Sequence, residues 1–515
     1  MALTKSVSEI IEGDSSGLLA IHPSWERVPL AEVGCVLNGF PFDSAQFSNS
    51  EGIPLVRIRD VVSGETRTFY VGAFDSSYVV RAGDLLVGMD GDFNTARWRS
   101  ADALLNQRVC KIEIDARFYV PGLLDRVLPA YLGAIHAETS SVTVKHLSSR
   151  TIEDIRLPLP PLAEQHRLAE KLDELFTELD AGVAELLAAQ KKLAQYRQSL
   201  LKAAVEGALT ADWRAVHPPQ ESGEALLARI LQERRARWEA RQLDKFKAQG
   251  KAPPKGWQTK YTEPLSPQTN ELPALPQGWT WASLGQLLES LSSGSRDWSP
   301  YYDRGSCVFV MAQNVRAWRP DFSFRQFVDP PLGDRDRARS EVKKDDLLVT
   351  IVGANTGQVC RIDTELDSHF VCQSVALLRL VQADSSEYVN AVLNSEGHGQ
   401  LQFREMNYGA GRPHLSFDQL ESVRIPLPPF EEQLEIVKQV ESALTATKQM
   451  ESEFVHLCRQ AAAQRQNILH SAFTGQLVPQ DLADEPASAL LARIRAERAE
   501  VEAAKKSPGR KKAAA

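Results

Sequence analysis

The chain carries one stretch of sequence twice, and this repeat constrains its fold more than any other feature. Residues 152–165 read IEDIRLPLPPLAEQ, and residues 420–433 read LESVRIPLPPFEEQ. The same offset later relates Gly207 to Gly475. Two copies of one pattern this far apart predict a duplicated architecture, in which each half of the chain builds the same kind of unit.

Each copy predicts a short strand, a proline stop and a long helix. Pro161 and Pro429 can begin a helix but cannot lie inside one, and the next prolines are Pro218 and Pro479. Apolar positions then recur at alternating spacings of four and three, the seam of a coiled coil. The seam residues that we expect to pair, and to form the spacer and partner-binding surface, are Leu168, Leu172, Leu175, Leu179, Leu186 and Leu193 in the first helix and Ile436, Val440, Phe454, Leu457 and Ile468 in the second.

Two stripes of equal length and phase favour antiparallel pairing of the two helices. The alternative is that each stripe packs on its own globular domain. At 1.5 Å per residue, a helix of roughly 40 residues spans ~60 Å, so a paired rod would act as a rigid spacer.

A chain of 515 residues is too long for one hydrophobic core. Its composition predicts the following order of segments: a leader at 1–20, an α/β domain at 21–160, a long helix at 161–217, a helical segment and proline-rich connector at 218–274, a second α/β domain at 275–428, a second long helix at 429–480, and a short helix with a basic tail at 481–515.

Short β-type runs between turn residues predict a mixed sheet in the first domain. These runs are Ile53–Ile58, Asp84–Gly88 and Arg108–Ile114, and a helical stretch follows at Leu123–Ile135. The second domain repeats several anchors, including a tryptophan at its start. The predicted fold is therefore mixed α/β, with two globular domains separated by two long antiparallel coiled-coil helices in a pseudo-two-fold repeat.

Charge argues against a simple nucleic-acid binder, whose footprint is usually basic. The net charge is −8. Residues 1–161 hold 15 Lys and Arg against 20 Asp and Glu, and residues 275–429 hold 15 against 19. Only residues 218–274 are basic, at 10 against 7. A DNA-binding role would therefore need local arginine clusters or charge supplied by a partner.

The cysteines and the hydropathy pattern indicate a cytoplasmic protein. The six cysteines form neither a CxxC pair nor a zinc-binding spacing, so they read as reduced thiols. No run of 18 apolar residues predicts a membrane span.

The repeated motifs resemble the specificity subunit of type I restriction–modification systems. The resemblance rests on the doubled PLPPxxEQ helix start, the Gly278-Trp279 entry with Leu284, the DLLV strand and the Gly475-x-Leu477 exit. The family implies two target-recognition domains, at 21–160 and 275–428, that each read half of a split site in double-stranded DNA. It also implies docking of two methyltransferase subunits and, through them, of restriction subunits. S-adenosylmethionine, ATP and magnesium are then expected in the partners, and no cofactor in this chain.

Two stretches are similar to catalytic motifs but lack features that those motifs need. Asp329-Pro-Pro-Leu332 is similar to the DPPY motif of amino-methyltransferases, but leucine cannot stack on a flipped base. Asp321 with Glu341 and Lys343 mimics a nuclease pattern, yet the first domain has Val79-Val80-Arg81 at the corresponding place. No Walker loop and no histidine cluster for a metal occur. We therefore predict a non-catalytic subunit.

Base reading requires Arg, Asn, Gln or Lys side chains on rigid loops, because these make bidentate contacts in the major groove. The candidates are Arg57, Arg59, Asn94, Arg97, Arg99, Asn106, Gln107 and Arg108 in the first domain, and Gln313, Asn314, Arg316, Arg319, Asn355, Gln373, Asn407 and Arg412 in the second.

Alternative functions remain open from the sequence. The chain could be a protein–protein scaffold with two binding modules on a coiled coil, or a self-contained nuclease or methyltransferase. A sequence-specific gel shift with a methyltransferase partner would separate the first alternative from a DNA specificity subunit.

Overall fold

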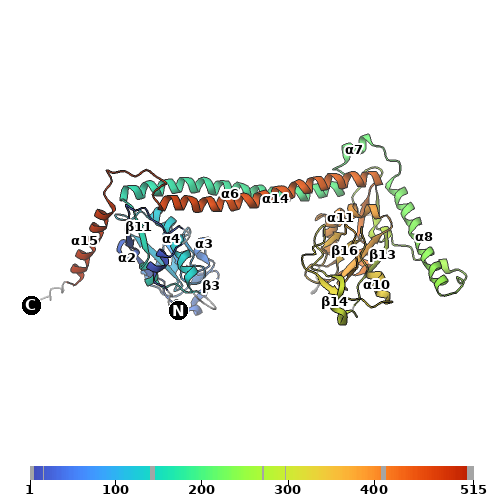
Figure 1. The fold of residues 1–515 in the computed structure, drawn as a ribbon, viewed down its shortest axis with the longest axis horizontal. Helices are drawn as coiled ribbons and strands as arrows, with labels where there is room; N and C mark the ends of the chain where they lie inside the picture. Colours follow the sequence, from blue (N-terminus) through green and yellow to red (C-terminus); the bar gives the residue numbers. More distant parts are fainter. Residues whose placement is uncertain are drawn as a thin grey trace, which may run out of the picture. The chain divides into compact units, whose positions relative to one another are not determined.

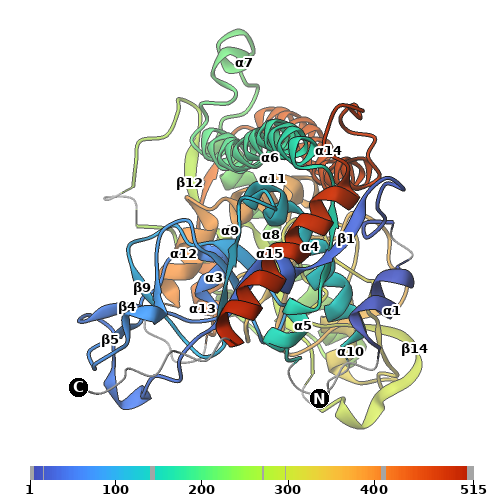
Figure 2. The same cartoon turned by 90° about the vertical axis from the view of Figure 1, so that its left-hand side faces the viewer.

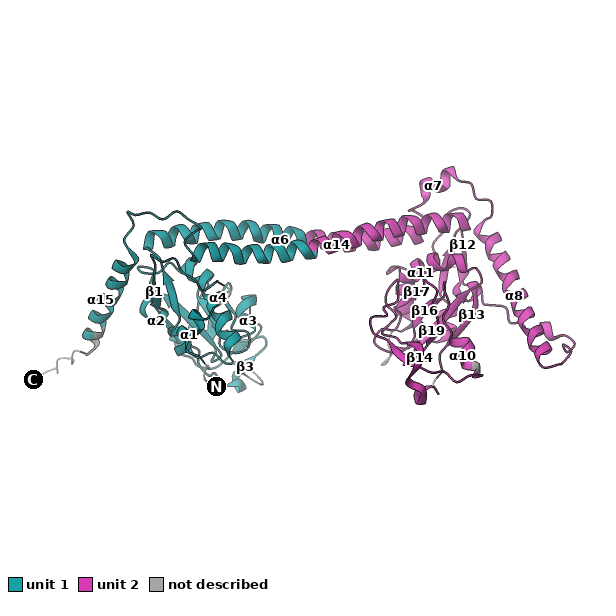
Figure 3. Cartoon of the chain, viewed as in Figure 1, with its two compact units in different colours: residues 1–186, 455–515 teal, residues 187–454 magenta. Residues whose placement is uncertain are grey.

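The computed structural model describes residues 5–14, 17–139, 145–268, 272–295, 297–407 and 413–506. It divides into two compact units, residues 1–186 with 455–515 and residues 187–454 (Figure 3). Two helices of 44 residues each, α6 (Leu162–Val205) and α14 (Phe430–Phe473), run through both units. Each unit therefore consists of one globular module and half of each long helix.

The first module contains a two-stranded sheet β1-β11, a four-stranded sheet β2-β10-β7-β8 and a five-stranded sheet β3-β5-β4-β9-β6. Its strands are β1 (Glu26–Pro29), β2 (Gly34–Asn38), β3 (Phe47–Ser48), β4 (Ile53–Val56), β5 (Phe69–Tyr70), β6 (Val79–Val80), β7 (Leu85–Gly88), β8 (Thr95–Arg97), β9 (Ala103–Leu105), β10 (Val109–Ile114) and β11 (Arg156–Leu159). Its helices are α1 (Val7–Glu12), α2 (Leu30–Val33), α3 (Asp60–Ser63), α4 (Pro121–Glu138) and α5 (Ser149–Glu153), with α15 (Ala487–Lys506) added from the end of the chain.

The second module contains sheets in the orders β12-β20, β13-β19-β16-β17 and β15-β14-β18. Its strands are β12 (Thr280–Ser283), β13 (Leu288–Ser293), β14 (Tyr302–Val310), β15 (Gln326–Val328), β16 (Leu347–Thr350), β17 (Val359–Arg361), β18 (His369–Val371), β19 (Val375–Leu380) and β20 (Arg424–Leu427). Its helices are α7 (Ala211–Val216), α8 (Gly223–Ala248), α9 (Leu284–Leu287), α10 (Arg335–Ser340), α11 (Ser386–Asn394), α12 (Gly399–Met406) and α13 (Phe417–Glu421) (Figure 1).

The two modules share their two-stranded and four-stranded sheets, which confirms the predicted duplication, whereas the third sheet has five strands in the first module and three in the second. The four-stranded sheets match strand for strand, and each module opens with a strand that pairs antiparallel with the strand before its long helix. The predicted β-runs of the first module are found as β4, β7 and β10, and its predicted helix as α4. The central strands β7 and β16 are explained by their local sequence, since each is a short run of buried Leu and Val between turn residues.

The long helices lie antiparallel within each unit. In the first unit, Leu168 near the start of α6 and Phe473 at the end of α14 belong to one core. In the second unit, Ile436 near the start of α14 and Val205 at the end of α6 belong to another. The start of one helix thus packs beside the end of the other in both units, as predicted for paired stripes.

The seam residues make two kinds of contact, some with a globular module and some with the other long helix. Leu168, Leu172, Ile436 and Val440 are buried in the cores of the modules, so the first turns of each helix pack on a globular module. Further along, the helices contact each other, with Leu179 and Leu186 lining one groove with Leu457. The first turns of each long helix therefore pack on a globular module, as the alternative prediction has it. The middle of each helix packs against the other helix, as the coiled-coil prediction has it.

The remaining seam residues divide in the same way. Leu193 is buried, Ile468 packs against the first core, and Leu175 and Phe454 are partly exposed.

The ends of the chain add to the first module more than predicted. Within the predicted leader, α1 buries Val7, Ile10 and Ile11 in the core, so this part of the segment is an ordered part of the module. Helix α15 contacts β1 and α2 and buries Leu490 and Ile494 in the same core (Figure 2). Of the predicted basic tail, residues 507–515 lie outside the part that the structure describes.

A buried carboxylate fastens each module to its long helix. In the first unit, the indole N–H of Trp25 donates to Glu164 Oε2 at 3.0 Å. In the second, the indole N–H of Trp279 donates to Glu432 Oε2 at 2.9 Å. Both glutamates lie in the PLPPxxEQ motif and are 1% exposed. Burial raises the pKa of the Glu164 carboxyl, and the hydrogen bond from Trp25 opposes this shift.

The glutamine that follows each glutamate adds hydrogen bonds where the long helix meets the module. Gln165 accepts the N–H of Val120 at 2.9 Å and donates to the carbonyl of Pro160 at 3.0 Å. Gln433 donates to the carbonyl of Pro428 at 3.0 Å. The repeated motif therefore has a structural explanation: its prolines begin the helix and its Glu-Gln pair bonds the helix to the module.

We predict that Trp279→Phe destabilises the protein by about 1–3 kcal/mol, because it leaves a buried carboxylate oxygen without its donor. Thermal unfolding measures the change. Trp281→Phe is the matched control, since the Trp281 indole bonds the Pro273 carbonyl at an exposed site and should cost no more than about 0.5 kcal/mol. Equal effects of the two substitutions would contradict the assigned role of the Trp279–Glu432 hydrogen bond.

Candidate nucleic-acid interface

Parallel strands bring polar side chains to one edge of the first module. Strands β4 and β9 are parallel, with Val56 opposite Leu105. Arg57 and Asn106 are the residues that directly follow, so they emerge at the same edge. Arg57 and Gln107 are exposed there. The N–H of Gln107 donates to Asn106 Oδ1 at 2.9 Å, which fixes the start of this turn.

The neighbouring strands place two more candidates at this edge. Strand β10 begins where β7 ends, and the N–H of Met89 donates to the Arg108 carbonyl at 2.9 Å. The N–H of Gly88 donates to the Asn94 carbonyl at 2.8 Å, so the exposed Asn94 lies beside them.

The Arg108 side chain is held by a short network. Its Nη1 lies 3.2 Å from Asp90 Oδ2, and His146 Nδ1 is 2.6 Å from the other oxygen of the same carboxylate. The Arg108 side chain remains 56% exposed. An arginine fixed on one side and open on the other is preorganised for a bidentate contact.

Arg59 and Arg99 flank helix α3. Arg59 is 65% exposed and lies 3.7 Å from Asp60 Oδ1, and the exposed Arg99 covers Gly64 at the end of the helix. Both side chains are accessible, and the contacts described for them are with Asp60, Thr68 and Gly64 rather than with the strand-end turns.

The second module builds the same edge from different residues. Strands β14 and β18 are parallel, with Val310 opposite Val371, and the exposed Gln313 and Gln373 follow them. The N–H of Ile351 donates to the Ser374 carbonyl at 2.9 Å, which brings the β16–β17 turn alongside.

Two asparagines of the second module complete this edge. Asn355 lies in the β16–β17 turn and is partly exposed. Asn407 closes α12, because its Nδ2 donates to the Phe403 carbonyl and its Oδ1 accepts the N–H of His414, each at 2.9 Å. Arg412, the remaining candidate of this module, lies outside the residues that the structure describes.

Comparison with known proteins agrees with this architecture. A family model for the type I restriction modification DNA specificity domain matches residues 23–188 and 339–453. The type I restriction enzyme EcoBI specificity subunit of Escherichia coli is 34% identical over 97% of this chain and 98% of its own length. The StySPI specificity subunit of Salmonella potsdam is 23% identical over 95% of this chain and 98% of its own length.

The chain belongs to the family of type I restriction–modification DNA specificity subunits.

A solved structure supports the fold of this specificity subunit. A chain described under "Structural basis underlying complex assembly and conformational transition of the type I R-M system" aligns with a TM-score of 0.59 over 88% of this chain and 99% of its own length, at 18% identity. Family membership decides between the hypotheses left open by the sequence: the protein is a non-catalytic DNA-recognition subunit.

The specificity subunit uses one sequence-predicted arginine as an internal brace. Arg97 Nε donates to Asp125 Oδ2 at 2.6 Å, and its other nitrogens donate to the carbonyls of Gly83 and Pro121. Arg361 stands at the end of the equivalent strand β17 and bonds Ser386 and Asp345 in the same manner. These bonds occupy the guanidinium, so we leave Arg97 out of the proposed DNA surface.

Asn314 is also internal, which corrects its assignment as a base-reading residue. It is 1% exposed, and its Oδ1 accepts the N–H of Met311 at 2.9 Å. In the first module, Asp60 Oδ2 accepts the N–H of Arg57 at 2.9 Å. Both side chains close the turn after a strand that ends at the strand-end edge described above, a role that needs a short side-chain acceptor.

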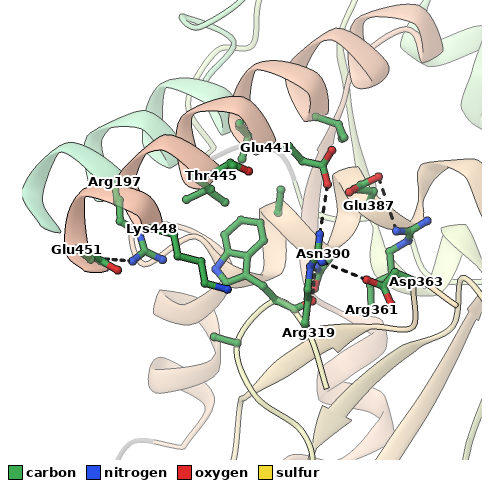
Figure 4. A pocket seen from close by; sticks show the side chains of 16 residues that line it. Arg197, Arg319, Arg361, Asp363, Glu387, Asn390, Glu441, Thr445, Lys448 and Glu451 are labelled. Atoms are coloured by element: carbon green, nitrogen blue, oxygen red, sulfur yellow. Dashed lines mark hydrogen bonds and ion pairs between the residues drawn. The ribbon is translucent and has the colours of Figure 1, made fainter. Parts of the chain in front are cut away.

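The remaining arginines of the second module point to different places. Arg316 is exposed and bonds the adjacent Val315 carbonyl. Arg319 lies 3.4 Å from Asp363 and 3.9 Å from Glu441 on helix α14. Figure 4 shows Arg319 reaching toward that helix across a cavity of about 680 Å³. Arg319 is therefore placed at the joint between module and helix, and we leave it out of the proposed DNA surface.

This cavity also holds groups that sequence reasoning missed. Trp318 has φ 78° and follows Asn314 by four residues, just as Gly64, with φ 70°, follows the equivalent Asp60 in the first module. A bulky residue in this conformation costs about 1–3 kcal/mol. In the first unit, Phe176 of α6 packs between Arg126 and Arg465, whereas Leu444 of the second unit lines the cavity. No local sequence signal marks the cavity, because its walls come from five separate segments of the chain.

Two neighbouring carboxyl groups, those of Glu387 and Glu441, line this cavity (Figure 4). Burial raises the pKa of Glu387 on α11 to about 7, and the neighbouring Glu441 carboxyl adds to the shift, while Arg361 and Arg319 oppose it. A carboxyl whose pKa is higher in the folded than in the unfolded protein stabilises the fold below its ordinary pKa, and that stability is lost as the pH rises through about 7.

We predict that the second unit of the specificity subunit unfolds at a lower temperature at pH 8 than at pH 6, by about 2–4 °C. Glu387→Gln should remove most of this difference, because glutamine stays neutral. Glu396→Gln is the control: Glu396 pairs with Arg404 at the exposed surface and should leave the pH dependence intact. An unchanged pH dependence in Glu387→Gln would exclude the carboxyl pair as its source.

Two further features of the described residues concern metal binding and membrane insertion. Among the residues described, no group of three or more His, Cys, Asp or Glu side chains is placed to hold a metal ion. Within the same part of the chain, no helix is long and apolar enough to span a bilayer.

Proposed function

We propose that this specificity subunit reads a bipartite site in double-stranded DNA, one half with the strand-end edge of each module. The domain boundaries given above for 21–160 and 275–428 define the two proposed target-recognition domains. The observation that carries the proposal is the equivalence of Gln107 and Gln373. Each is exposed in the turn that enters the central strand, β10 or β19, beside the end of a parallel strand pair.

The proposed base-reading groups are the candidates that the fold leaves accessible. Glutamine and asparagine suit adenine, and arginine suits guanine, in the major groove. The set is Arg57, Arg59, Asn94, Arg99, Gln107 and Arg108 in the first module, and Gln313, Arg316, Asn355 and Gln373 in the second; Asn407 is left out because its amide nitrogen and oxygen both bond within the module.

The partners follow from the same proposal. Two methyltransferase subunits dock on the paired helices, and restriction subunits join through them. S-adenosylmethionine, ATP and magnesium belong to those partners. The six free cysteines suit a reducing compartment, and we place the protein in the cytoplasm.

We predict that Gln107→Ala and Gln373→Ala each relax one position in a different half of the methylated motif, by about 10- to 100-fold in discrimination. The readout is the methylated motif in a host that lacks other methyltransferases, with the variant expressed beside its partner subunits. Gln258→Ala is the matched control, an exposed glutamine in the 3-10 turn Trp257–Lys260 of the connector, and should leave the motif unchanged. A change in both halves from one substitution would exclude independent reading.

We further predict weak DNA binding by the purified chain alone at physiological salt, because phosphate neutralisation dominates affinity and both modules are net acidic. Gel shifts with and without the methyltransferase partner measure this. Affinity for the recognition site should rise sharply when the partner is added. Equal, tight and specific binding by the chain alone would contradict the requirement for partner charge.

A further inference from the structure

The strand-end edge of the first module carries an exposed aromatic ring beside its polar groups. Phe40 follows strand β2 and is 43% exposed. We propose that Phe40 recognises the 5-methyl group of a thymine in the half-site read by the first module, and is thus a specificity-determining residue. This inference rests on the proposed function, because it requires that the edge faces DNA.

The backbone fixes Phe40 beside the base-reading turn. Its N–H donates to the Leu105 carbonyl at 2.9 Å, and it forms a parallel bridge with Asn106. The preceding Gly39 permits this approach, since a Cβ there would lie 2.0 Å from the Asn106 carbonyl oxygen. Phe40 therefore stands next to Gln107 on a rigid strand end.

Neighbouring aromatic rings hold the Phe40 side chain in place. Its ring centroid lies 5.1 Å from Phe42 and 5.2 Å from Tyr78. Phe42 is buried and packs on Tyr70 at 4.8 Å. One part of the ring is thus supported by the core, and the rest is open at the edge. A ring ordered in this way loses little conformational entropy when it contacts a base.

The polar groups around Phe40 indicate which base its ring would contact. Arg57 and Arg108 suit the acceptors of guanine, and Gln107 suits adenine. In the major groove, thymine differs from the other bases by its methyl group, which only an apolar surface can recognise. The Phe40 ring packs on Tyr78, and its backbone bridge to Asn106 places this large apolar side chain directly beside Asn106 and Gln107.

The second module lacks this feature. Strand β13 is followed by Gly294, which matches Gly39, and the next residue, Ser295, is 1% exposed. Dependence on a thymine methyl through this position is therefore confined to the half-site of the first module, the half altered by Gln107→Ala.

The test replaces thymine by deoxyuridine, which removes only the methyl group. Binding of the subunit with its methyltransferase partners is measured on the natural motif and on duplexes with uracil at each thymine of either half-site. Uracil at one position of the first half-site should weaken wild-type binding by about fourfold, the effect of burying one methyl group. Phe40→Ala should bind the thymine and uracil duplexes equally, whereas Phe40→Leu keeps an apolar contact and should keep the preference.

Controls separate this inference from the proposed function and from folding defects. Phe327→Ala, at another exposed aromatic on β15, should keep the uracil effect. Unfolding temperatures of the variants identify any loss of structure. The inference is overturned if wild-type binding ignores uracil in the first half-site, if that half-site contains no thymine, or if Phe40→Ala keeps the preference. A wild-type motif that is not bipartite would instead overturn the proposed function.

Discussion

A carboxylate buried in the first turn of each long helix joins helix to module, and the arrangement of the rest of each unit depends on it. Glu164 and Glu432 each accept an indole N–H at a helix N-terminus, where the helix dipole favours negative charge. Desolvating a carboxylate is costly unless its hydrogen bonds are made, so the tryptophan, the glutamate and the proline start must occur together. This coupling explains why the motif is repeated while the interiors of the modules differ.

The joint leaves the far edge of each module free to vary. Both edges are formed by the ends of parallel strands and by the turn into β10 or β19. The side chains that hold these edges by internal hydrogen bonds are equivalent in the two modules: Asp60 corresponds to Asn314, and Arg97 to Arg361. The side chains exposed at the two edges differ. Two copies of one scaffold thus present two different sets of hydrogen-bonding groups, which suits a protein that reads two unlike half-sites.

The candidate site could be predicted only in part, because residue type indicates what a side chain can bind but not where it points. Gln107 and Gln373 are predicted from their residue type and lie in equivalent exposed turns. Arg97 and Asn314 also belong to the residue types that can read bases, but their side chains make hydrogen bonds inside the modules. Phe40 was missed because an exposed aromatic ring has no sequence signature: its exposure follows from the close approach of Gly39 to another strand.

The sequence by itself determined the duplication, the proline starts and the two long helices, because periodicity and proline act within one segment; their antiparallel pairing was only favoured by the equal length of the two stripes. Tertiary structure decided which surface covers each apolar stripe: Leu168 and Leu172 pack into a module, while Leu179 faces the other helix. It also decided that Phe176 fills the joint of one unit, whereas Leu444 borders a cavity in the other. Periodicity shows which face of a helix is apolar, but the partner of that face comes from distant segments that only the folded chain brings together.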